Sequence, residues 1–172
     1  MALAPVDDRE SELWAPIVGH PDPHDQGGVE WREQPADLTA FVESRDHLGL
    51  PPLFDAQHDA IRALLGDDPR AVFAERSGDD LRNQLAVLLW GKGSGKDYLC
   101  SVLVCYLVHI LLCLRDPQLW FGFGPGEPID VLNVAYNADQ AKFVFFAKLK
   151  ARVQGWRWLY ERFNVYEGGR AQ

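Results

Sequence analysis

A glycine-rich segment that follows a short apolar run constrains this chain more than any other feature. Residues 90–97 read Trp-Gly-Lys-Gly-Ser-Gly-Lys-Asp, directly after the continuous apolar run at 85–90. Gly91, Gly93 and Gly95 allow the backbone to turn with positive φ and to bring amide groups inward. Those N–H groups, together with the start of a following helix, create a cradle for an anion. The segment therefore predicts a phosphate-binding loop.

The loop differs from the common signature, GxxxxGK followed by Ser or Thr, at two positions. Gly95 and Lys96 supply the Gly-Lys pair. Trp90 replaces the first glycine, and Asp97 replaces the hydroxyl residue. We expect Lys96 to reach the β- and γ-phosphates of a nucleotide as a point charge. The residues expected to bind the nucleotide are Gly91, Lys92, Gly93, Ser94, Gly95, Lys96 and Asp97.

Asp97 predicts an unusual dependence on metal. A carboxylate can bind Mg²⁺ directly or through water, so Asp97 is the candidate metal ligand. Without the metal, its negative charge would repel the phosphates. We therefore expect nucleotide binding to depend on Mg²⁺ more strongly than it does with the usual hydroxyl.

Apolar patterns predict the elements around the loop. Glycines directly after the run at 85–90 favour a buried parallel strand. The predicted order is strand, loop, helix, strand and helix, with strands at 85–90 and 130–136 and helices at 98–114 and 137–154. Asn137, with Gln140 three residues later, is expected to cap the helix at 137–154. Further helices are expected at 54–65 and 156–163, and a loop at 115–128.

This order is typical of an α/β fold in which helices flank an open parallel sheet, as in P-loop NTPases. The sheet is expected to be incomplete on its C-terminal side. Residues 1–50, rich in proline, glycine and acidic residues, are predicted to form a partly irregular N-terminal extension. Residues 51–172 are predicted to form the N-terminal part of a P-loop ATPase domain. Trp14, Trp31 and Phe41 indicate that the extension docks on some surface and does not remain free.

Charge is divided unevenly along the chain, whose formal net charge is −8. Residues 1–80 hold 18 acidic and 6 basic residues, whereas residues 81–172 hold 7 acidic and 11 basic residues. Any contact with nucleic acid is therefore expected in the second half. The candidates for a DNA or ring contact, with the solvated face of a helix as the alternative, are Lys142, Lys148, Lys150, Arg152, Arg157 and Arg162.

The segment at 98–114 is apolar over 17 residues, which is at the short limit for a membrane span. Because it follows a phosphate-binding loop, we expect it to be buried in the core instead, with no membrane contact. All three cysteines lie in it and lack CxxC spacing, so we expect reduced thiols. The acidic N-terminus lacks the apolar stretch of a signal peptide, so secretion is not expected.

Two segments together resemble the large terminase subunits of tailed phages, the motors that package DNA into the prohead. LLWGKGSGKD and VLNVAYNADQAKFVFF carry the resemblance, which covers roughly residues 51–155. Tryptophan before the glycines and aspartate after the lysine resemble one branch of that family. The resemblance implies ATP and Mg²⁺ as cofactors, a homo-oligomeric ring, and a place in the host cytoplasm. It also implies double-stranded DNA, the portal and the small terminase subunit as partners.

The resemblance implies roles for two further residues. Gln57 ends a segment, PLFDAQ, that is similar to the adenine-contacting segment of the family. Its alternative is an ordinary polar position on an amphipathic helix. Lys92 falls where many terminases carry a basic residue that senses the γ-phosphate, and its alternative is a solvated loop lysine. Lys96 and Lys92 are accordingly the candidate catalytic residues.

One part of a motor ATPase is not found in the sequence. Hydrolysis needs an apolar strand that ends in Asp-Glu, to hold Mg²⁺ and to activate water, and no segment after Lys96 has this pattern. We therefore expect the N-terminal segment of a terminase large subunit, an ATPase as the full-length protein but inactive as the isolated chain. The alternatives are an ATP-binding assembly module that does not hydrolyse ATP, and another P-loop ATPase such as a helicase-like enzyme.

Overall fold

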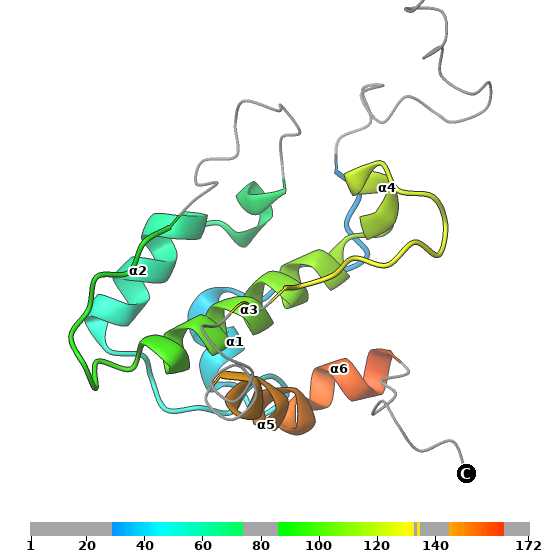
Figure 1. Cartoon of the computed structure of the whole chain (residues 1–172). Coiled ribbons are helices and arrows are strands. Elements are labelled where there is room, and N and C mark those ends of the chain that lie inside the picture. The colour runs from blue at the N-terminus through cyan, green and yellow to red at the C-terminus, as the bar shows by residue number, and fades with distance from the viewer. Residues whose placement is uncertain (1–28, 74–85, 133, 135–144, 164–172) are drawn as a thin grey trace, which may run out of the picture.

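The computed structural model describes residues 29–73, 86–132, 134 and 145–163 (Figure 1). The regular elements there are α1 (Leu38–Glu43), α2 (Asp55–Leu65), the 3₁₀ helix η3 (Pro69–Val72), α3 (Lys96–Cys113), α4 (Pro117–Phe121), α5 (Ala147–Gly155) and α6 (Arg157–Arg162).

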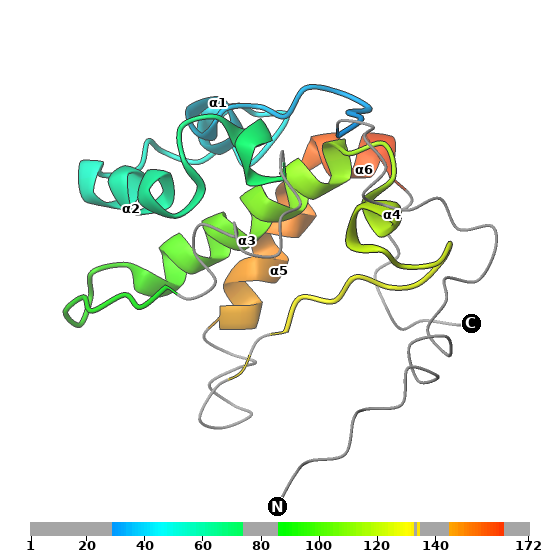
Figure 2. The ribbon, with the colours of Figure 1, turned by 90° about the horizontal axis from the view of Figure 1, so that it is seen from above.

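Helix α3 is the centre of the described part. Figure 2 shows it between α1 and α2 on one side and α5 on the other. Its sequence is apolar almost all round, as expected for a helix covered on several faces. Eight of its side chains are buried: Leu99, Ser101, Val102, Cys105, Tyr106, His109, Ile110 and Cys113. The helix is also long and apolar enough to cross a membrane, a test that the core helix of a soluble protein passes equally.

Local capping explains where the first helices begin and end. The Asp37 carboxylate accepts a hydrogen bond of 2.9 Å from the backbone N–H of Ala40 at the start of α1. Helix α2 ends at Gly66, whose φ of +83° suits glycine. The helix predicted at 54–65 is therefore confirmed to within one residue.

Residues of the N-terminal extension share the core of the domain. Phe41 is fully buried and stacks on His109, with ring centroids 5.0 Å apart. Its ring also forms a T-shaped pair with Trp156, with ring centroids 5.3 Å apart. Trp31 forms an isolated antiparallel bridge with Leu114, at the end of α3. The predicted docking is confirmed for Trp31 and Phe41, whereas Trp14 lies outside the described residues.

The described residues of the predicted buried strand at 85–90 do not form a strand. Positions 86–90 are outside any strand, and Val87 and Leu89 are 68% and 91% exposed. The described positions of the second predicted strand, 130–132 and 134, are likewise not in a strand. An apolar run becomes a strand only by pairing with a neighbour, and no sheet is present in the described ranges to pair with. The parallel sheet therefore remains a prediction.

The C-terminal half differs from expectation at α4. The predicted loop at 115–128 contains this short helix, because the Asp116 carboxylate caps it through the N–H of Leu119 at 3.0 Å. Helix α5 confirms the end of the helix predicted at 137–154, whereas Asn137 and Gln140 lie outside the described residues. The helix predicted at 156–163 is confirmed as α6.

The three cysteines are unpaired in the structure. Cys105 and Cys113 are buried, and burial raises the pKa of both thiols to about 12. Both therefore stay protonated at neutral pH. Cys100 is only half-buried, although its pKa is also raised by burial.

Candidate nucleotide-binding site

The glycine-rich loop turns into α3 through two residues with left-handed backbone. Gly93 and Gly95 have φ of +80° and +81°, a region that side chains disfavour. The N–H of Ser94 donates to the carbonyl of Gly91 at 3.4 Å and closes the turn. A Cβ atom on Gly91 or Gly93 would meet nothing within 4 Å, so the loop is open to a ligand.

Lys96 is the first residue of α3, and its side chain folds back over the loop. Its ammonium group donates to the carbonyl of Gly91 at 2.9 Å and also to the carbonyl of Trp90. The first N–H groups of any α-helix lack partners within the helix, and the helix dipole adds positive potential there. The ammonium group and the N-terminus of α3 therefore combine at one place, where an anion would be stabilised.

Gln57 connects helix α2 to this loop. It is buried, and its side-chain oxygen accepts a hydrogen bond of 3.2 Å from the N–H of Phe54. Its side-chain nitrogen lies 3.0 Å from the position that a Cβ atom of Gly95 would take. The first turn of α2 therefore packs directly against the glycine that begins α3.

A hollow of about 440 Å³ lies between α2 and the loop. It is lined by Phe54, Ala56, Gln57, Leu89, Trp90, Gly91 and Ser94. Phe54 is 78% exposed, so its ring can stack against a flat ligand. An aromatic face, an amide and a phosphate loop in one hollow are the groups that a nucleotide site needs.

Helix α5 places two basic side chains against the start of α3. The ammonium group of Lys148 lies 3.5 Å from the carboxylate of Asp97. Arg152 donates to the hydroxyl of Ser101 at 2.6 Å, and its guanidinium lies 4.4 Å from the centre of the Tyr98 ring. Burial lowers the pKa of the half-buried Arg152.

Four of the six basic residues that the sequence predicted as candidates for DNA contact have partners within the chain. Lys148 has an acidic neighbour in Asp97, whereas Arg152 contacts a hydroxyl and a ring. Arg157 pairs with Asp46 and Glu161, and Arg162 pairs with Glu33. Lys150 is exposed, and Lys142 lies outside the described residues. Sequence reasoning missed the partnership with α3, because the four-residue spacing of Lys148 and Arg152 shows only that they share a helix face.

Asp97 and Lys92 stay candidates in the site. Asp97 is exposed on the first turn of α3, where its carboxylate could meet a metal that the phosphates also hold. Among the described residues there is no group of three or more His, Cys, Asp or Glu side chains that could hold a metal ion. A single exposed carboxylate beside the loop is a donor set that Mg²⁺ can use, because Mg²⁺ usually takes one or two carboxylates together with phosphates and water. Lys92 is exposed in the loop, which is compatible with both of its predicted roles.

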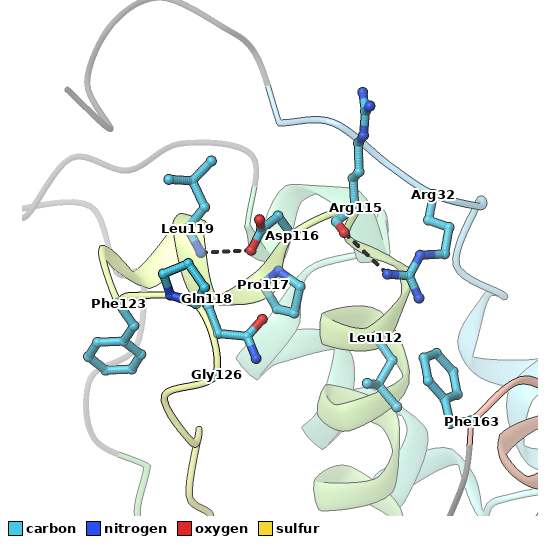
Figure 3. Close-up of a pocket in the computed structure, with 11 residues that line it drawn as sticks. Arg32, Leu112, Arg115, Asp116, Pro117, Gln118, Leu119, Phe123, Gly126 and Phe163 are labelled. Carbon is cyan, nitrogen blue, oxygen red and sulfur yellow. Dashed lines mark hydrogen bonds between the residues drawn. The ribbon is translucent and has the colours of Figure 1, made fainter. Parts of the chain in front are cut away.

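A second hollow, of about 640 Å³, lies beyond the C-terminal end of α3 (Figure 3). Although it is larger, it has no glycine-rich loop. The guanidinium of Arg32 donates to the carbonyl of Arg115 at 3.2 Å and lies 5.7 Å from the centre of the Phe163 ring. Arg115 forms an ion pair with Glu30, so both cationic side chains of this hollow have partners within the chain. The loop at 90–97 therefore remains the stronger candidate for a nucleotide.

Comparison with known families assigns the domain. Residues 22–168 match the model of a family described as "Uncharacterized protein MJ0330, N-terminal P-loop domain". The chain belongs to this family. It is therefore a P-loop NTPase domain, which indicates nucleotide binding and supports that part of the sequence interpretation. The match does not extend to a phage terminase. No curated protein and no solved structure matches the chain.

Proposed function

We propose that the domain binds ATP as its magnesium complex, with the phosphates on the loop at 91–97 and the base in the hollow beside α2. One observation carries the proposal: Gln57 packs against Gly95. This contact joins the side chains suited to a base and the loop suited to phosphates into one continuous site.

The phosphate half of the site rests on charge. Lys96 donates to two loop carbonyls, and a phosphate would offer its ammonium group a charged acceptor in their place. Asp97 would hold Mg²⁺, which neutralises the phosphate oxygens and supplies electrostatic stabilisation when bound. By the resemblance to terminases, Lys92 would contact the terminal phosphate.

The base half rests on Phe54 and Gln57. The exposed Phe54 ring offers a face for stacking. The amide of Gln57 can donate through its nitrogen and accept through the second lone pair of its oxygen. That pair of functions complements the N7 and N6 edge of adenine, so the site is expected to prefer ATP to GTP.

The resemblance to terminases extends the proposal to a motor. Gln57 lies against the loop, as an adenine-contacting residue would. In that reading the domain works in a ring on double-stranded DNA in the host cytoplasm, with the portal and small terminase subunit as partners. The alternative is a module that binds ATP for assembly and does not hydrolyse it.

Titration calorimetry of the purified chain with Mg·ATP tests the proposal. Saturable binding of one ATP per chain is expected, with weaker binding of Mg·GTP. Heats of dilution alone would rule the proposal out. An ATP turnover assay distinguishes a hydrolysing domain from a module that only binds ATP. Steady turnover that Lys96→Ala abolishes would show that these 172 residues contain the catalytic carboxylate.

A further inference from the structure

The carboxylate of Asp97 has a basic partner that lies outside the phosphate-binding loop. This carboxylate lies 3.5 Å from the ammonium group of Lys148, which is on α5 and 51 positions further along the chain. Both side chains are about half exposed, at 52% and 46%. The pair therefore lies at the surface, where water, a metal ion or a ligand can reach it.

A second contact fixes the position of Lys148. Arg152 follows it by four residues, as Ser101 follows Asp97, so the two contacts are one helical turn apart on both helices. Arg152 is half-buried and holds α5 on α3 through the Ser101 hydroxyl and the Tyr98 ring. Since α5 is anchored there, the backbone of Lys148 is held at a position from which its ammonium group reaches Asp97.

We propose that Lys148 is a positioning residue that sets the magnesium dependence of nucleotide binding, by competing with Mg²⁺ for the carboxylate of Asp97. The inference rests on the proposed function. Without metal, Lys148 neutralises Asp97 and so reduces its repulsion of the phosphates. With metal, Asp97 has to exchange the ammonium group for Mg²⁺.

The proposal predicts that Lys148→Ala changes ATP affinity in opposite directions with and without Mg²⁺. ATP binding in EDTA should weaken, because the Asp97 charge then faces the phosphates alone. In Mg²⁺, ATP binding should tighten, and the Mg²⁺ concentration for half-saturation at fixed ATP should fall. Exposed ion pairs contribute modestly, so each change should be about two- to fivefold.

Three variants complete the test. Lys150→Ala removes a charge of the same sign from an exposed position on α5 and should leave both affinities unchanged. Lys148→Arg keeps the charge and should restore the parent behaviour. In an Asp97→Asn background, Lys148→Ala should have no effect in either condition, because there is no carboxylate left to compete for. Circular dichroism and thermal melts confirm that each variant is folded.

The outcomes are distinguishable by calorimetry. Equal loss of affinity in EDTA and in Mg²⁺ would mean that Lys148 contacts the nucleotide or only supports the fold, and it would overturn the inference. Unchanged affinity in both conditions would overturn it as well. Those results leave ATP binding by the parent chain intact. Absence of ATP binding by the parent chain would instead remove the proposed function, and the inference with it.

Discussion

The side-chain nitrogen of Gln57 lies 3.0 Å from the point that a Cβ atom on Gly95 would occupy, and Gly95 itself has a φ of +81°. Two independent constraints therefore require glycine at this position. One is the left-handed backbone that starts α3, and the other is the close approach of α2. The glycine-rich loop and the hollow beside α2 thus meet at this contact.

Gly95→Ala should destabilise the domain, because the new methyl group meets Gln57 and the backbone is strained. The left-handed conformation alone costs about 1–2 kcal/mol for a residue other than glycine. Gly91→Ala is the matched control, since a Cβ atom there would meet nothing within 4 Å. Its effect should stay within about 0.5 kcal/mol. Urea unfolding of the two variants measures the difference, and equal stabilities would refute this account of the loop.

Gln57→Glu should separate the structural role of Gln57 from recognition of the base. A carboxylate oxygen can still accept the hydrogen bond from the Phe54 N–H, so the start of α2 should be preserved. The donor of the amide is lost, so the preference for ATP over GTP should fall by roughly two- to tenfold. Affinities for both nucleotides give the ratio. An unchanged ratio would indicate that Gln57 serves only α2 and the packing against Gly95.

Sequence reasoning succeeded where local chemistry decides the structure. The glycines and Lys96 identify the loop, and the stripe at 54–65 identifies α2, because turn geometry and helix amphipathicity depend on nearby residues. The Asp116 cap before Pro117 was a local signal too, and it was overlooked.

The features that were not predicted depend on contacts between segments that are distant in the sequence. The run at 85–90 could be helix or strand by itself, and strands form only through pairing with another segment. In the site, Gln57 was placed by resemblance, whereas its contact with Gly95 required the fold. The contacts of Lys148 and Arg152 with α3 join positions 51 residues apart, so they could not be seen in either segment alone.

His109 should make the stability of the domain depend on pH. Burial, with smaller contributions from His47 and Arg162, lowers its pKa from 6.5 to about 3. Its ring nitrogen Nε2 accepts the N–H of Ala36 at 2.9 Å, which requires the neutral form. Below pH 6.5 the unfolded chain therefore binds a proton that the folded chain excludes, and stability falls as pH decreases toward 3.

Between pH 7.5 and pH 5.5 the expected loss from His109 is about 1.4 kcal/mol. Burial also lowers the pKa of His47, which adds a loss in the same direction. Denaturant unfolding across this range measures the slope, and His109→Gln should flatten it, because glutamine can accept the same hydrogen bond without titrating. If parent and variant lose stability equally, His109 is not the group responsible.

The most direct test of the central claim is calorimetric titration of Mg·ATP into the parent chain, Lys96→Ala and the control Lys150→Ala. Lys96 supplies the charge over the loop, and loss of one charge-assisted contact costs about 1.5–3 kcal/mol. The affinity of Lys96→Ala should therefore fall roughly tenfold or more, while Lys150→Ala binds like the parent. Equal affinity in Lys96→Ala and the parent would contradict the assignment of this loop as the phosphate-binding site.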